Sequence, residues 1–175
     1  MSGTSGVQVT GVKQTLKTLN KLAPEMRKGF NKEYKNIVKP IVDDAKSRVP
    51  TQAPLSGMNR NWKHLGTWDG QKVKRGIVSK IDTRKSRSKS ASNFSNAETV
   101  GALYVMSKTG YGIIYDMAGR KTQGSPFVQA LQSQWGSASR SMWPAWETNA
   151  EKVTKSVADL VHETERQVER LIKAI

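Results

Sequence analysis

Two histidines are the side chains of this sequence best suited to bind a metal or to move a proton near neutral pH. His64 falls in a stretch punctuated by glycine and proline, and His162 lies on the charged side of a helical pattern. Neither belongs to an HExxH motif or to a comparable ligand spacing. We therefore favour solvated or surface-packed histidines over metal ligands.

Carboxylates and glycine motifs give no better evidence for catalysis. Asp43 and Asp44 are neighbours in a helical pattern, so they point to different faces and cannot form an acid/base pair from that geometry alone. The sequence contains no GxSxG, Walker or dinucleotide-binding motif, and the absence of cysteine excludes thiolate metal sites. We predict that the protein is not an enzyme and uses no cofactor, metal or small-molecule substrate.

Positive charge is the strongest global signal. The 29 lysines and arginines against 14 acidic residues give a formal net charge of +15, which favours an anionic neighbour such as nucleic acid, an acidic protein or an anionic membrane. The densest cluster lies in a serine-rich segment, 83–97, that we predict to be a flexible loop; its members are Arg84, Lys85, Arg87 and Lys89. A solvated loop and a phosphate contact without sequence readout both remain open. Our hypothesis is that the loop faces DNA or an acidic protein.

The chain shows no targeting pattern. Its apolar runs are too short for a transmembrane helix, and residues 1–6 lack the basic and apolar regions of a secretory signal. We expect an intracellular protein without a membrane partner and with a flexible tail over residues 1–6.

Apolar periodicity predicts two helices before residue 50. Val7 and Val9 are consistent with a short edge strand, and residues 12–22 then form an amphipathic helical pattern that stops at Pro24. A longer helical pattern follows and ends at Pro50. Pro40 lies inside it, where proline costs about 3 kcal/mol, so we predict one helix with a kink.

The middle of the chain combines a loop with alternating patterns. Residues 51–70 read as a loop with Trp62 and Trp68, which we interpret as anchors to the core or to a neighbouring subunit rather than as base-stacking or sugar-binding residues. Alternation over 71–82, 98–107 and 111–118 predicts strands, the last two forming a hairpin.

The C-terminal part is expected to hold a loop and the longest helix. Residues 119–141 read as an extended loop that permits a short helical turn near Phe127, Val128 and Leu131. Trp143 to Ile175 carry apolar residues at helical spacing over about 48 Å, which is longer than a small domain needs. We assign the first turns to the core and the second half to subunit or partner contact, through Val168, Leu171, Ile172 and Ile175.

These patterns predict one α+β domain over residues 1–175. It should contain a small antiparallel sheet of three to four strands, packed against a kinked N-terminal helix and a long C-terminal helix.

Four short motifs carry a resemblance to a known family. A helix ending in "DDAKSRVP" and followed by "LSG" resembles the opening of the neck and tail-completion proteins of long-tailed, non-contractile bacteriophages. "YGIIYDMAG" is similar to a strand of that family that ends in an acidic residue and glycine. "MWPAWE" is similar to its Pro-Phe-containing entry to a C-terminal helix. The serine-rich basic loop and the long link before the last helix depart from the family pattern, and no functional residue is carried onto them.

The resemblance implies a virion structural protein of the phage neck, assembled in the host cytoplasm. Proteins of this family form rings, typically hexameric, at the head–tail junction, between capsid-side portal or adaptor connectors and tail terminator or tube proteins, and genomic DNA passes through the lumen. The alternative, which rests on charge, is a basic nucleic-acid-binding protein without sequence specificity.

Overall fold

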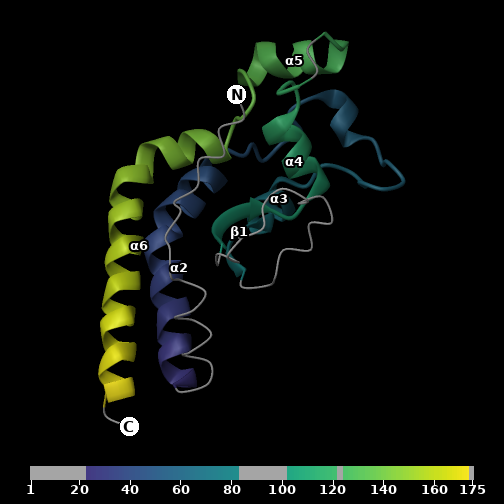
Figure 1. The fold of residues 1–175 in the computed structure, drawn as a ribbon. Helices are drawn as coiled ribbons and strands as arrows, with labels where there is room; N and C mark the ends of the chain where they lie inside the picture. Colours follow the sequence, from purple (N-terminus) through teal and green to yellow (C-terminus); the bar gives the residue numbers. More distant parts are fainter. Residues whose placement is uncertain (1–22, 83–101, 122–123, 174–175) are drawn as a thin grey trace, which may run out of the picture. The chain divides into compact units, whose positions relative to one another are not determined.

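The computed structural model describes residues 23–82, 102–121 and 124–173 (Figure 1). These residues form a mostly helical α+β fold with a two-stranded antiparallel sheet packed against the N-terminal helix. The elements in chain order are α2 (Pro24–Ser47), the 3-10 helix η1 (Ser56–Asn59), α3 (Gly70–Gly76), β1 (Ile77–Asp82), β2 (Ala102–Ser107), α4 (Gly110–Met117), α5 (Pro126–Trp135) and α6 (Met142–Lys173).

The chain divides into two compact units that share its long elements. Unit 1 takes Met1–Val38, Lys80–Tyr104 and Glu151–Ile175, and unit 2 takes Lys39–Ser79 and Val105–Ala150. The single domain expected from the sequence stays a prediction.

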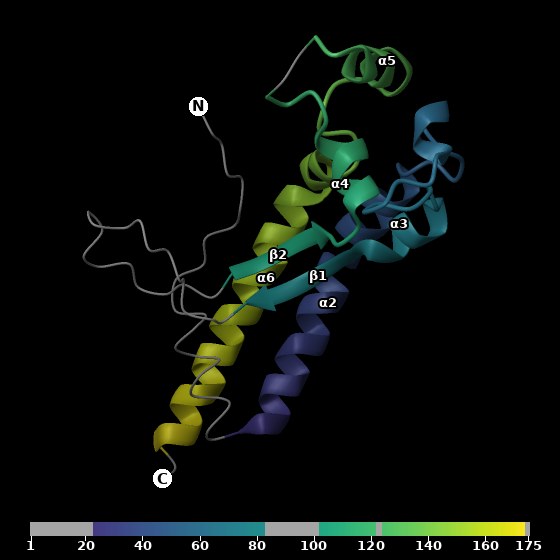
Figure 2. The ribbon, with the colours of Figure 1, turned by 90° about the vertical axis from the view of Figure 1, so that its right-hand side faces the viewer.

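The core of unit 1 is built from two helical faces. Phe30, Tyr34 and Val38 are buried at four-residue steps along α2. The buried residues of α6 in this unit follow steps of four and three: Val153, Val157, Val161, Thr164 and Val168. Figures 1 and 2 show these two helical segments side by side, with the chain running along each in opposite directions. Unit 1 is therefore an antiparallel helix pair with an apolar seam.

Unit 2 has an aromatic core. The Trp68 ring meets the rings of Tyr111 and Tyr115 edge to face, with 6.0 Å between centroids in both pairs. Tyr115 in turn meets Trp135 at 5.9 Å. Such edge-to-face pairs add stability beyond the area that they bury. The rings join the loop before α3 to α4 and α5.

The second predicted helix is confirmed as one continuous element. α2 begins at Pro24, whose missing N–H costs nothing in a first turn, and continues through Pro40 to Ser47. The kink at Pro40 stays a prediction. The predicted edge strand at Val7 and Val9, the helix over 12–22 and the basic loop over 83–97 all lie outside the described residues.

The sheet is smaller than predicted. Residues 111–118 were expected to form a strand, but residues 110–117 form helix α4. Burial explains the difference, because Tyr111, Gly112, Tyr115 and Asp116 are buried whereas Ile113 is exposed, which follows a helical period and not the alternation of a strand. The Thr109 hydroxyl accepts a hydrogen bond from the Gly112 N–H at 3.2 Å and caps the helix.

Two other predicted segments also contain helices. The stretch 71–82 begins with α3, whose first turn is capped by Asp69, and becomes a strand only at Ile77. Segment 119–141, expected to be an extended loop with at most a short helical turn, contains α5, which is capped by Ser125. Strand β2 pairs with β1, so the predicted hairpin of 98–107 with 111–118 is wrong. Within the described residues the sheet has two strands, not three to four.

The final helix is confirmed, but its division into core and contact halves needs correction. α6 begins at Met142, with Pro144 in its first turn, and reaches Lys173. The second half was expected to be exposed, yet Val161 and Val168 are buried there. The buried stripe continues because α2 lies alongside this part of α6 (Figure 2).

Candidate functional site

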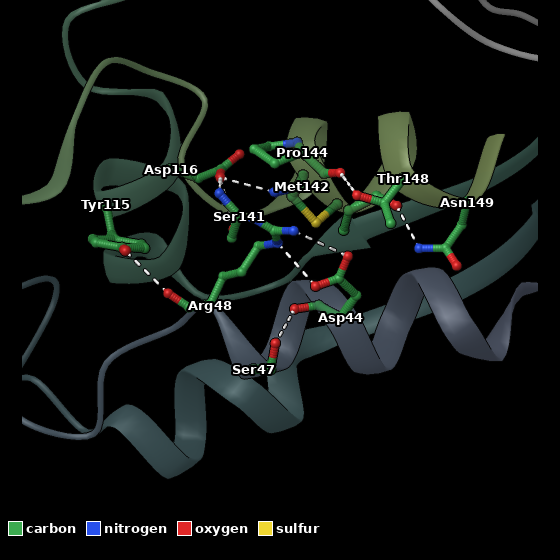
Figure 3. A network of polar contacts seen from close by, with 11 residues as sticks. Asp44, Ser47, Arg48, Tyr115, Asp116, Ser141, Met142, Pro144, Thr148 and Asn149 are labelled. Atoms are coloured by element: carbon green, nitrogen blue, oxygen red, sulfur yellow. Dashed lines mark hydrogen bonds and ion pairs between the residues drawn. The ribbon is translucent and has the colours of Figure 1, made fainter.

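The most enclosed group of polar side chains in the described part of unit 2 surrounds Asp116, which is 4% exposed. Its Oδ1 atom accepts hydrogen bonds from the Ser141 N–H at 2.6 Å, the Ser141 hydroxyl at 2.6 Å and the Met142 N–H at 3.1 Å (Figure 3). Its Oδ2 atom accepts one from the Ser139 hydroxyl at 2.5 Å. Asp116 of α4 is thus a cap, supplied from another element, for the N-terminus of α6.

Charge reinforces this arrangement. The first N–H groups of a helix have no partner within the helix, and the helix dipole places partial positive charge at this end. A carboxylate is the side chain that best satisfies both. Asp116 therefore fixes the point where the longest helix begins.

Arg140 is the second buried polar residue of this cluster. Its Nη1 atom donates to the carbonyl oxygens of Tyr115 at 2.7 Å and Ala118 at 3.1 Å, and its Nε atom donates to that of Gly136 at 2.9 Å. The Tyr115 and Ala118 carbonyls lie at the C-terminal end of α4, and Gly136 ends α5. A cation there complements the negative ends of two helix dipoles.

The pKa directions agree with this enclosed setting. Burial lowers the pKa of Arg140, and the neighbouring Tyr115 and Asp116 oppose that shift. Burial raises the pKa of Tyr115, with Arg140 acting against the shift and Asp116 adding to it. The Tyr115 hydroxyl donates to the Arg48 carbonyl at 3.1 Å (Figure 3). Tyr115 and Arg140 thus serve as structural connections within unit 2.

This cluster does not have the geometry of an active site. Both oxygens of Asp116 already accept hydrogen bonds from the protein, and Ser139 and Ser141 donate to that carboxylate instead of facing a histidine base. The sequence identifies Asp116 only as the acidic end of a predicted strand, and no motif points to Arg140. A helical reading of "YGIIYDMAG" would have placed Asp116 next to Tyr115 on the buried face.

A different surface of unit 2 combines exposed apolar and basic side chains. Trp62 is 52% exposed, Leu65 38% and Ile113 48%. Arg60 and Lys63 are exposed beside Trp62 in the chain. Neither cation forms an ion pair with a carboxylate within the described residues. We call this set of five residues the apolar–basic surface.

The loop that carries this surface is held by several hydrogen bonds. Trp62 and Gly66 exchange backbone hydrogen bonds at 2.9 and 2.7 Å, and the Trp62 indole donates to the Gly57 carbonyl at 3.1 Å. The Tyr111 hydroxyl of α4 lies 2.9 Å from the Gly66 carbonyl oxygen, to which it donates. A methyl group on Gly110 would stand 2.5 Å from Leu65, so the loop lies directly against the start of α4.

In unit 1 the end of α6 carries a second exposed apolar surface. Ile172 is 55% exposed and Leu171 37%. Glu165, Glu169 and Ile172 are four and three residues apart, so they share one stripe beside the buried stripe of α6. We call these three residues the acidic stripe.

The residues predicted for contact therefore have different positions. Trp62, Leu171 and Ile172 are exposed, as a contact role requires, whereas Trp68 and Val168 are buried and belong to the core. The Trp68 indole donates to the Thr51 carbonyl at 3.3 Å, in agreement with a loop anchor. The remaining predicted residues, Arg84, Lys85, Arg87, Lys89 and Ile175, lie outside the described residues.

Other predicted features can be located more briefly. His64 and His162 are both exposed, and His162 lies 3.5 Å from Glu165. Within residues 23–82, 102–121 and 124–173 no three His, Cys, Asp or Glu side chains gather as metal ligands would. In the same residues, no helix combines the length and the apolar character needed to cross a bilayer.

Comparison of the chain with protein-family models, with curated proteins and with solved structures finds no match in any of the three.

Proposed function

We propose that the protein is a virion structural protein of the phage neck, which forms a ring at the head–tail junction, connects the capsid-side connector to the tail tube and lets DNA pass. The proposal is supported by the order of pieces that the sequence resemblance rests on: a helix that ends near proline, a loop, a small sheet and a long C-terminal helix. The helical "YGIIYDMAG" segment departs from the strand that the resemblance implies.

The observation that carries the proposal is the presence of two unlike exposed apolar surfaces on one chain. One contains Trp62 with Arg60 and Lys63, and the other contains Ile172 with Glu165 and Glu169 on the same helical stripe. Ring subunits meet through heterologous contacts, which require two different patches on every copy. An enzyme or a monomeric binding module has no such requirement.

The charge of the chain suits the same role. A net charge of +15 attracts the DNA backbone without reading its sequence, as a conduit for the genome requires. The partners in this role are further copies of the chain in a hexameric ring, portal or adaptor-side connectors, and tail terminator or tube proteins. No catalytic group, cofactor or small-molecule substrate enters the proposal.

Electron microscopy of the full chain, alone and co-expressed with the products of its neighbouring genes, tests the proposal. We expect rings of uniform diameter, and we expect portal, capsid and tail-tube genes among those neighbours. A chain that forms no ring in either preparation, and that is missing from purified virions by mass spectrometry, would contradict it.

The alternative function is that of a nucleic-acid-binding protein without sequence specificity, which the net charge of the chain favours. A salt titration of DNA binding distinguishes this alternative from the neck protein. Tight binding that weakens steeply with salt, by a protein that remains a monomer or dimer beside every neighbouring product, would support the alternative over the neck protein.

A further inference from the structure

We propose that the apolar–basic surface of one copy binds the acidic stripe of α6 in a second copy, so that these two surfaces form the contact between ring subunits. The inference rests on the proposed function and adds the residues through which the copies meet. Within residues 23–82, 102–121 and 124–173, neither Arg60 and Lys63 of the first surface nor Glu169 of the second forms an ion pair.

The apolar–basic surface has the composition of an interaction site. Tryptophan and arginine are the residues that most often dominate the energy of protein interfaces, and Trp62 and Arg60 lie two positions apart on one loop. Leu65 lies against the first turn of α4, and Ile113 follows one turn later on that helix. Three apolar side chains thus occur with two cations that have no carboxylate partner among the described residues.

This surface is also ordered before any partner arrives. The Trp62 indole N–H is already bonded to the Gly57 carbonyl, so the exposed part of the ring is apolar. The exchange of backbone hydrogen bonds between Trp62 and Gly66, and the Tyr111 hydroxyl, hold the loop in place. A preordered side chain loses little conformational entropy on binding.

The charges indicate which occupant fits. No acidic residue occurs between Asp44 and Asp69, a stretch that contains Lys46, Arg48, Arg60 and Lys63. An occupant must therefore bring carboxylates together with apolar side chains. Nucleic acid would supply the charge, and Trp62 offers one ring for stacking, but Leu65 and Ile113 are aliphatic and favour an occupant that also brings apolar side chains.

The chain itself contains a segment of the required chemistry. Glu165, Glu169 and Ile172 present two carboxylates and one apolar side chain along a single helical stripe, with Leu171 adjoining. Arg166, Arg170 and Lys173 adjoin the stripe in the chain, but none of them forms an ion pair with Glu165 or Glu169 among the described residues. His162 lies 3.5 Å from Glu165 and carries charge only when protonated. A helix that offers anchors three and four residues apart is a common ligand for an apolar surface.

Charge reversal on each side, followed by both together, tests the contact. The double variants Arg60→Glu/Lys63→Glu and Glu165→Arg/Glu169→Arg should each weaken self-association of the full chain at least about tenfold, because like charges then face each other. The chain that carries all four substitutions should recover most of the wild-type association. Sedimentation over a concentration series at physiological salt measures each constant.

Matched controls keep the total charge change the same. Arg120→Glu/Lys121→Glu changes two exposed cations of unit 2 beyond the opposite end of α4, and Glu151→Arg/Glu163→Arg changes two exposed carboxylates of α6 outside the stripe. Both controls should associate as the wild type does. Circular dichroism should show the same helix content in all variants.

Several outcomes would overturn the proposal. Association that survives either charge reversal would remove that surface from the contact while leaving the neck assignment intact. If both double variants lose self-association and the chain with all four substitutions does not recover it, the two surfaces do not contact each other. A wild-type chain that assembles only on a neighbouring virion protein would replace the second copy by that protein. A loss of DNA binding, with unchanged association, in Arg60→Glu/Lys63→Glu would assign the surface to nucleic acid.

Discussion

Asp116 of α4 accepts two hydrogen bonds from Ser141, one from the backbone N–H and one from the hydroxyl, both at 2.6 Å. The pair lies 25 positions apart in sequence and joins the end of one helix to the start of the longest one. This contact establishes where α6 begins.

Removal of this carboxylate should destabilise the protein substantially. Asp116→Ala leaves the Ser141 and Met142 N–H groups without their acceptor in a buried position, and we expect a loss of about 2–4 kcal/mol in the free energy of unfolding. Denaturant unfolding measures it. The control is Asp43→Ala, which breaks only the exposed pair with Lys39 and should cost at most about 1 kcal/mol. Equal losses in both variants would show that the cap contributes little.

The two loop tryptophans should behave oppositely. Trp68 is 8% exposed and contacts two tyrosine rings, so Trp68→Ala should cost about 3–5 kcal/mol. Trp62 is half exposed, so Trp62→Ala should cost about 1 kcal/mol or less and should weaken association instead. Thermal unfolding and sedimentation of the same samples separate the effects. A stability loss at Trp62 as large as at Trp68 would place Trp62 in the core.

The end of α6 offers a similar contrast between assembly and folding. Polar substitutions at Leu171 and Ile172 should weaken assembly more than folding, because both side chains are exposed. The control is Val161→Ala, which opens a cavity in the seam and should lower the free energy of unfolding by about 1–3 kcal/mol. A large loss of monomer stability in the Leu171 and Ile172 variants would show that this end of α6 also belongs to the core.

Gly70 should tolerate no side chain. A methyl group there would stand 2.5 Å from the Thr51 carbonyl oxygen and 2.6 Å from that of Pro50, and both are backbone atoms that cannot move aside cheaply. We expect Gly70→Ala to lower the melting temperature clearly. Gly57→Ala is the control, since no atom lies within 4 Å of the added methyl, and it should change the melting temperature little. Similar effects of the two variants would contradict the close approach.

Alkaline pH should unfold the protein in part through Tyr34. Burial, with a smaller contribution from Tyr104, raises the pKa of Tyr34 above the ordinary value of 10.0. Above that pH the unfolded chain loses the proton while the folded chain keeps it, so stability is intact below about pH 10 and falls as the pH rises further. Tyr34→Phe should make this decline shallower. It should not abolish it, because burial also raises the pKa of Tyr115. An unchanged slope between pH 10 and 12 would contradict the assignment.

Sequence alone determined the helices with long apolar periods. α2 and α6 were predicted because their apolar residues keep a helical spacing over many turns. A pattern of that length does not also fit the two-residue alternation of a strand. The exposure of His64, His162 and Ile172 could likewise be predicted from the neighbouring residues in the sequence.

Only the tertiary structure decided how the short segments fold. Residues 111–118 fit both an alternating and a helical period, and a buried Asp116 that caps α6, together with Tyr111 and Tyr115 facing Trp68, selects the helix. Burial of Val168 depends on α2 lying beside it, which no local pattern contains. Periodicity reports which side of an element is apolar, whereas the partner that covers that side comes from residues far away in the chain.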